Sequence, residues 1–70
     1  MRFKFYNDEW ELFIAHCGFS DEELSIITYI RRGWASADIA AELCLSGRTL
    51  ARRKDRIIEK IIHYISKSPL

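Results

Sequence analysis

The sequence predicts an all-α fold, namely a small domain of four helices. Apolar residues recur at intervals of three and four positions through most of the chain, which is the periodicity of helices that bury one side. Asparagine or serine residues precede these segments, where N-caps are expected, and glycines follow the first two, where helices commonly end. The chain has 70 residues, 49% of them apolar, so residues 1–70 are expected to form a single domain with a compact core.

The first helix is expected over residues 7–17. Asn7 suits the N-cap position, and Asp8 and Glu9 follow it, where negative charge interacts favourably with the helix dipole. Gly18 is the residue expected to end the helix. Four apolar residues share one side of it: Trp10, Phe13, Ile14 and Cys17.

The second helix is expected over residues 20–32. Ser20 and Glu23 form a capping box, in which each side chain accepts a hydrogen bond from the other residue's backbone amide. Phe19 and Leu24 flank the box at the spacing of a hydrophobic staple. The inward stripe is expected to be Leu24, Ile27 and Ile30.

The end of this second helix is predicted by Gly33, which suits the left-handed position after a helix. Trp34 is then expected to fold back toward Tyr29, as in a Schellman ending.

A third, short helix is expected over residues 36–43, with Ser36 as its cap, and a fourth over residues 46–65, with Ser46 as its N-cap. The link between them is so short that the chain has to turn a sharp corner if both helices bury their apolar sides. The inward residues of the third helix are Ile39, Ala40 and Leu43.

Charge is divided unevenly along the chain. Residues 1–45 carry four basic and eight acidic side chains, a net charge of −4, and residues 46–70 carry seven basic and two acidic ones, a net charge of +5. The formal total of +1 therefore hides a strongly basic C-terminal segment. Such a segment is the electrostatic footprint of a protein that binds a polyanion, although a solvated charged helix has the same composition.

A helical projection of the fourth helix separates a core side from a solvent side. With Leu50 directed into the core, Ile57, Ile61 and Tyr64 lie on the same side of the helix. The residues on the opposite side are Arg48, Arg52, Asp55 and Glu59, with Arg56 at the border.

This solvent side has the shape that a DNA major groove accepts. Guanidinium groups can reach base edges, and the small residues Gly47 and Ala51 leave room for close approach. Ser46 is a candidate phosphate contact, because the amides at a helix start attract anions. The residues therefore point to double-stranded DNA as a partner.

Residues 1–6 form an N-terminal arm that alternates charged and aromatic side chains. We expect Phe3 and Phe5 to pack on the helices. The alternative is an arm in which Arg2 and Lys4 contact DNA.

Residues 19–61 resemble the helix-turn-helix shared by LuxR-type regulators and by the last domain of bacterial sigma factors. The segments that carry the resemblance are "FSDEE", "RRGW" and "DIAAELCLSGRTLARR", with Ala40 at the helix crossing and Leu43, Leu45 and Leu50 as the plug between the two helices. The resemblance implies a three-helix core behind the N-terminal helix, with the last helix as recognition helix. It also implies a sequence-specific DNA-binding transcriptional regulator.

The resemblance implies roles for individual residues as well. The residues that would face base edges are Gly47, Arg48, Ala51 and Arg52. The residues that would contact phosphates are Thr49, Arg53 and Arg56, in addition to Ser46. Asp55 is expected either to pair with Arg52 or Arg48 or to accept a hydrogen bond from a cytosine amine as a further base-facing residue.

Three features depart from the family pattern. Ala35 stands where the family often has a serine or threonine cap. Cys44 stands at the turn, where glycine is favoured, and suits that place if its φ is not forced positive. The chain also has an extra helix in front and none after the fourth, which looks more like a sigma-factor final domain or the small sigma-like regulators of phages and mobile elements.

A single recognition helix makes a small interface, so we expect a second anchor, either a second copy of the chain or RNA polymerase. Ile58, Ile62 and Ile65 form a second apolar flank on the fourth helix, and we expect Trp10 and Phe13 of the first helix to cover it. The alternative is an exposed flank that pairs with the same flank of a second copy, as a homodimer contact. The alternative function is a protein-interaction module that binds RNA polymerase or another regulator without touching DNA.

Other classes of protein find no support in the sequence. There is no apolar run that could span a membrane, no secretory signal and no disulfide framework, so a cytoplasmic protein is expected. There is no glycine-rich phosphate loop and no nucleophile beside a histidine and an acid, so neither an enzyme nor a cofactor is expected. No zinc-ligand spacing is present, and no metal is expected, among His16, Cys17, Cys44 and His63.

Overall fold

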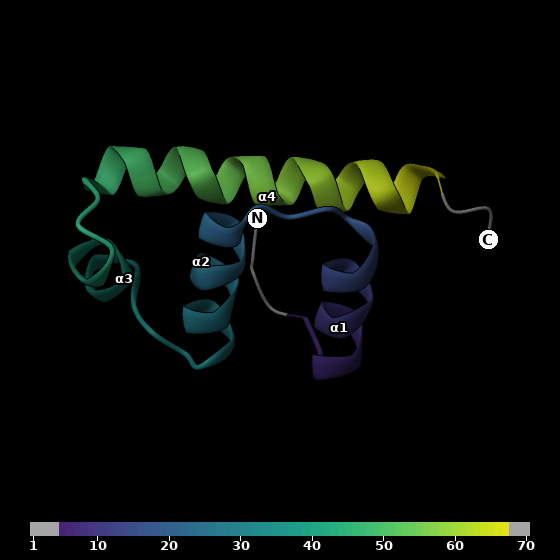
Figure 1. Cartoon of the computed structure of the whole chain (residues 1–70), viewed down its shortest axis with the longest axis horizontal. Helices are drawn as coiled ribbons and strands as arrows, with labels where there is room; N and C mark the ends of the chain where they lie inside the picture. The colour runs from purple at the N-terminus through teal and green to yellow at the C-terminus, as the bar shows by residue number, and fades with distance from the viewer. Residues whose placement is uncertain (1–4, 68–70) are drawn as a thin grey trace.

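The computed structural model describes residues 5–67, which form four helices and no strand (Figure 1). The helices are α1 (Asn7–His16), α2 (Asp21–Arg31), α3 (Ser36–Glu42) and α4 (Gly47–Lys67). The prediction of a small all-α domain with four helices is therefore confirmed. The expected contacts of Arg2, Phe3 and Lys4 lie outside the described residues.

Helix α4 supports the other three helices. It contains 21 residues, two more at its C-terminal end than the sequence predicts. Helices α1, α2 and α3 all pack against the same side of α4, and in Figure 1 they lie below it. The opposite side of α4 therefore stays open to solvent along the whole helix.

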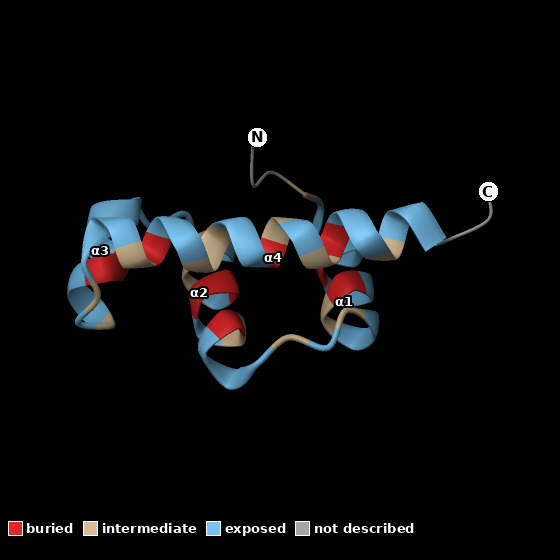
Figure 2. Ribbon diagram, turned by 90° about the horizontal axis from the view of Figure 1, so that it is seen from above, coloured by how far each residue is buried: buried red, intermediate tan, exposed pale blue. Residues whose placement is uncertain are grey.

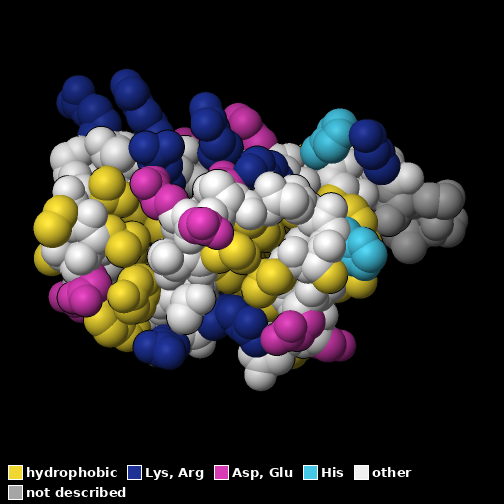
Figure 3. Space-filling model, in the orientation of Figure 1, with side chains coloured by type: hydrophobic (Ala, Val, Ile, Leu, Met, Phe, Trp, Pro, Cys, Tyr) yellow, Lys and Arg dark blue, Asp and Glu magenta, His cyan; other side chains and the backbone are white. Residues whose placement is uncertain are grey.

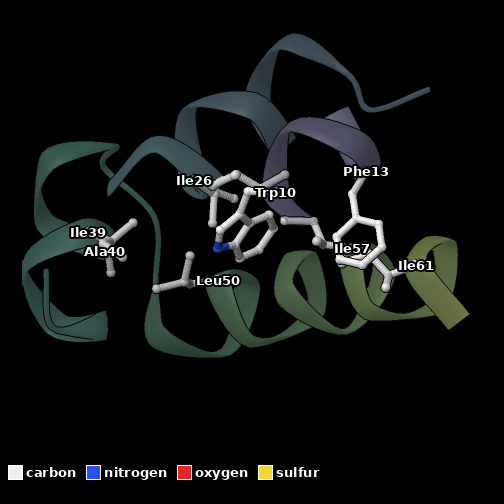
Figure 4. Close-up of a cluster of buried hydrophobic side chains, with 9 residues drawn as sticks. Trp10, Phe13, Ile26, Ile39, Ala40, Leu50, Ile57 and Ile61 are labelled. Atoms are coloured by element: carbon white, nitrogen blue, oxygen red, sulfur yellow. The ribbon is translucent and has the colours of Figure 1, made fainter. Parts of the chain in front are cut away.

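The core lies between α4 and the three shorter helices (Figures 2 and 4). Each helix contributes buried apolar side chains, and burying one of this size contributes about 1.5–3 kcal/mol. The buried apolar residues are Trp10, Phe13, Ile26, Ile27, Ile39, Ala40, Leu50, Ile57 and Ile61. On α4 these are the residues that the helical projection directs inward, and the expected Tyr64 packs half-buried beside them.

Aromatic rings fill the part of the core near α1. Phe5 meets Trp10 edge to face with ring centroids 5.1 Å apart, and it meets Phe13 in the same way at 5.0 Å. Phe13 in turn meets Tyr64 of α4 at 6.2 Å. Such aromatic pairs contribute about 0.5–1.5 kcal/mol beyond the area that they bury. Phe5 thus packs on the helices, as expected.

The start of α2 forms as the sequence predicts. The Ser20 amide donates a hydrogen bond to Glu23 Oε1 at 2.8 Å, and the Glu23 amide donates one to Ser20 Oγ at 3.3 Å. The capping box is therefore complete.

The end of α2 also matches its prediction. Gly33 has a φ of +83°, and the Trp34 amide donates a hydrogen bond to the Tyr29 carbonyl at 3.1 Å. The ring centroids of Tyr29 and Trp34 lie 4.4 Å apart, so the hydrophobic contact that accompanies a Schellman ending is present.

Two predicted N-caps are wrong by one residue. Helix α1 begins after Tyr6 and not after Asn7, because the Glu9 carboxylate accepts a hydrogen bond from the Tyr6 amide at 2.9 Å and extends the helix start. Helix α3 begins after Ala35, whose side chain cannot form a cap. The hydroxyl of Ser36, the expected cap, instead accepts a hydrogen bond from Lys54 Nζ of α4 at 2.8 Å.

The buried side of α2 is rotated relative to the predicted stripe. Ile26 and Ile27 are fully buried, whereas Leu24 and Ile30 are only half-buried. Glu23 is buried as well, with 3% of its surface exposed, because its carboxylate pairs with an α4 side chain. The ion pair with Lys60 of α4 therefore lets Glu23 be buried, and the buried side of α2 includes Glu23.

The corner between α3 and α4 is a second Schellman ending. The Leu45 amide donates a hydrogen bond to the Ala40 carbonyl at 2.8 Å, and the Cys44 amide donates one to the Ala41 carbonyl at 3.3 Å. This ending requires a left-handed residue after the helix, and Cys44 takes that place with a φ of +55°. The sequence predicts that Cys44 suits this turn only if its φ is not forced positive, and its φ is positive. A left-handed conformation at a residue with a Cβ atom costs about 1 kcal/mol.

Candidate nucleic-acid interface

The outward side of α4 carries three exposed arginines, Arg48, Arg52 and Arg56, which we call the arginine row. Figure 3 shows Lys and Arg side chains standing along the edge of the molecule that α4 forms. The core fixes the rotation of α4, because Leu50 and Ile57 are buried on its other side. The arginine row therefore points into solvent.

The N-terminus of α4 is held by its predicted cap. Ser46 Oγ accepts a hydrogen bond from the Thr49 amide at 3.1 Å and donates one to Thr49 Oγ1 at 2.9 Å. A Cβ atom added at Gly47 would meet nothing within 4 Å, so the space beside the first turn is open. This turn is thus both well formed and accessible.

The expected base-facing residues are all accessible. They come from the first three turns of α4: Arg48, Arg52 and Asp55 lie on its solvent side, and Gly47 and Ala51 lie on the flank beside α3. The exposed members are Gly47, Arg48, Ala51, Arg52 and Asp55.

The expected phosphate contacts divide into two groups. Ser46 and Arg56 are exposed, whereas Thr49 and Arg53 are half-buried on the flank that faces α2. An open hollow of about 370 Å³ on this flank is lined by Thr49, Arg52, Arg53 and Arg56, and we call it the basic hollow. Three guanidinium groups and a hydroxyl at one hollow form a set of donors suited to a phosphate group.

Two cations of α4 are paired with carboxylates from the first turn of α2. Arg53 Nε lies 2.6 Å from Glu22 Oε1, a contact between charges without the direction of a hydrogen bond. Lys60 Nζ donates a hydrogen bond to Glu23 Oε1 at 2.6 Å. Neither Glu22 nor Lys60 is among the predicted site residues, although Lys60 follows Arg53 and Arg56 on the same flank.

The Glu23–Lys60 pair is the more buried of the two pairs, with 5% of the Glu23 side chain exposed. Burial acts to raise the pKa of Glu23, but the hydrogen bonds from Lys60 and Ser20 and the charge of Lys60 outweigh it, so this pKa is lowered. Glu23 is therefore held in its charged form and ties α2 to α4.

The expected pairing of Asp55 with Arg52 or Arg48 is wrong. Within residues 5–67 no ion pair joins Asp55 to either arginine, because the side chains stand apart in solvent. The whole arginine row likewise makes no ion pair within 4.0 Å in this part of the chain. Asp55 is exposed, as the helical projection predicts.

The apolar flank of α4 is only partly covered. Ile58 is half-buried, whereas Ile62 and Ile65 are 44% and 48% exposed. The expectation that Trp10 and Phe13 cover the flank is therefore wrong for its last two residues, because these rings pack on the Ile57–Tyr64 side of α4.

The cysteines and histidines are not brought together as a metal site. Among the described residues no group of three or more potential ligands could hold a metal ion. His16 stacks on Tyr64 at 5.7 Å, and burial raises the pKa of the Cys17 thiol more than the charge of Lys60 lowers it. In addition, no helix in residues 5–67 has the length and apolar character needed to cross a membrane.

Comparison of the chain with protein-family models, with curated proteins and with solved structures gave no match. We therefore infer the function from the side chains of α4 and their surroundings.

Proposed function

We propose that this chain is a sequence-specific DNA-binding transcriptional regulator whose α4 enters the major groove of double-stranded DNA. The observation that carries the proposal is the arginine row, which presents three guanidinium groups on one helix, exposed and without an ion pair in residues 5–67. A guanidinium that is not engaged by a carboxylate can bind guanine or phosphate through two parallel hydrogen bonds.

The surroundings of the arginine row support the same function. Gly47 and Ala51 are small and exposed, so the backbone of α4 can come close to base edges. The corner at Cys44 turns α3 to the core side of α4 and leaves the other side open (Figure 1). A rigid, capped helix with one open side fits a major groove about 12 Å wide.

The test measures binding of a labelled random-sequence duplex by fluorescence anisotropy at about 50 mM and about 200 mM salt. Each phosphate contact adds about −0.9 to the slope of log affinity against log salt concentration. Several contacts should therefore reduce the affinity by about tenfold or more between these two salt concentrations. Selection from a random duplex pool then reveals whether one sequence is preferred.

A double variant in the arginine row and a single variant at the far end of α2 locate the interface. We expect R48A/R52A to lose most of the binding, because both side chains belong to the arginine row. We expect R32A to bind like the wild type, because Arg32 lies at the end of α2 that points away from α4 (Figure 1). Equal binding by wild type and R48A/R52A contradicts the proposal.

A second candidate function is a protein-interaction module that binds RNA polymerase or another regulator. One observation favours it: Trp34 is 38% exposed and lines an open hollow with Asp38 and Glu42, two exposed acids of α3. Helix α3 contains no Lys or Arg, so this surface suits a basic protein segment better than a phosphate backbone. A flat salt response toward DNA, with polymerase binding intact, would favour this function.

A further inference from the structure

We infer that Glu22 competes with nucleic-acid phosphate for Arg53 at the basic hollow, so that the Glu22–Arg53 ion pair lowers the affinity of the chain for DNA. The inference rests on the proposed function and adds a regulatory residue to it. Glu22 belongs to α2 and lies outside the recognition helix, so no role in binding follows from its position in the sequence.

Glu22 contacts the basic hollow through one of its four lining residues, Arg53. Its Oε1 atom lies 2.6 Å from Arg53 Nε, and Arg53 lines the hollow together with Thr49, Arg52 and Arg56. Arg53 Nε itself is buried and makes no hydrogen bond, but the side chains of Arg53 and Glu22 are 41% and 45% exposed, so a ligand can reach the remainder of the guanidinium. A phosphate that enters the hollow therefore meets a guanidinium that already has a carboxylate beside it.

A carboxylate and a phosphate are both anionic partners of a guanidinium, so the negative charge of Glu22 beside Arg53 opposes the approach of a phosphate to the same group. Exposed ion pairs are weak, and they shift an equilibrium constant by about 1.5-fold to fivefold. DNA can therefore displace Glu22, but part of the binding free energy is used in doing so. The neighbouring Glu23–Lys60 pair differs, because its carboxylate is buried and stays with its partner.

The experiment compares E22Q with D21N. Both variants remove one negative charge from the first turn of α2, but Asp21 is exposed and makes no ion pair within the described part of the chain. The general loss of repulsion toward DNA is thus nearly the same in both. The probe is the labelled random-sequence duplex, measured over a series of salt concentrations.

We expect E22Q to bind the duplex about two- to fivefold more tightly than the wild type, and D21N less than about 1.5-fold more tightly. The salt slope of E22Q should steepen by about one, because Arg53 gains a phosphate contact. In the R53Q background, E22Q and D21N should have the same effect. Since unfolding would weaken binding, a gain in affinity cannot arise from damage to the fold.

The outcomes separate the inference from the proposed function. If the wild type binds DNA, and E22Q and D21N bind equally well with equal salt slopes, Glu22 is no competitor and only the inference is overturned. If the wild type, E22Q and D21N all fail to bind at low salt, the proposed function is overturned and the inference is overturned with it. Tighter binding by E22Q that persists in the R53Q background also contradicts the inference, because the effect then does not pass through Arg53.

Discussion

The carboxylate of Glu23 accepts a hydrogen bond from Lys60 Nζ at 2.6 Å, and 37 residues separate the two in the chain. The pair joins the first turn of α2 to the third quarter of α4. Lys60 Nζ also lies 3.4 Å from the Gly18 carbonyl, so one ammonium group holds the loop between α1 and α2 as well. This contact links three parts of the fold at one point.

We expect K60M to destabilise the domain by about 1–3 kcal/mol, because it leaves the buried Glu23 carboxylate without its main partner. Urea unfolding followed by circular dichroism measures the change. K67M serves as control, since Lys67 is exposed in the last turn of α4, and its loss should cost less than about 1 kcal/mol. Equal effects of the two substitutions would show that the Glu23–Lys60 pair contributes nothing to the free energy of unfolding.

Stability should also fall in acid through Glu23. Because its pKa is lower in the folded chain than in the unfolded chain, Glu23 contributes stability that is present above the unfolded pKa and lost as the pH falls through the folded one. The free-energy difference between wild type and E23Q should therefore shrink as the pH is lowered from about 5. A constant difference from pH 7 to pH 2 would contradict the assigned charge state.

We expect C44G to stabilise the domain by about 0.5–1 kcal/mol, because glycine adopts the positive φ of this turn without the strain of a Cβ atom. The control is C44A, which keeps the Cβ atom and should give no such gain. Thermal unfolding of the reduced proteins compares them. A lower melting temperature for C44G would show that this turn does not need a left-handed residue.

Leu50 is 2% exposed at the corner between α3 and α4, and L50A should cost about 2–5 kcal/mol because it leaves a cavity there. L12A removes the same atoms from a leucine that is 47% exposed, so it should cost less than about 1 kcal/mol. Chemical denaturation of both variants tests the difference, and similar losses would mean that Leu50 does not fill the corner.

Substitutions in the arginine row should separate sequence reading from general attraction. R52A should weaken binding to a selected site about tenfold or more and relax the sequence preference, since a bidentate base contact discriminates by about 1–3 kcal/mol. R56A should weaken binding to selected and scrambled duplexes alike. Both variants should keep the helical spectrum, because both side chains are exposed. Loss of helicity in either would show that the side chain supports the fold.

Features that depend on a few neighbouring residues could be predicted from the sequence. The capping box at Ser20, the Schellman ending at Gly33 and the cap at Ser46 each involve partners within five positions. The orientation of α4 was also predictable, because its buried residues Leu50, Ile57 and Ile61 recur at the spacing that places them on one side of the helix.

Features that depend on packing between helices could not be predicted. The sequence shows Glu23 as a capping residue, but it does not show that Lys60 stands opposite and draws Glu23 inward. Likewise the spacing of Arg53, three positions after Leu50, does not show that the first turn of α2 brings Glu22 beside it. The positive φ of Cys44 follows from the sharp corner and not from the residue type.

Helix α4 serves as the common partner of three helices of only 10, 11 and 7 residues. Isolated helices shorter than about 12–15 residues are marginal in water, so the short ones depend on α4 to persist. The chain should therefore acquire its structure in one cooperative transition. Any molecule that stabilises α4 from its solvent side would slow the opening of the entire domain, including helices that it never touches.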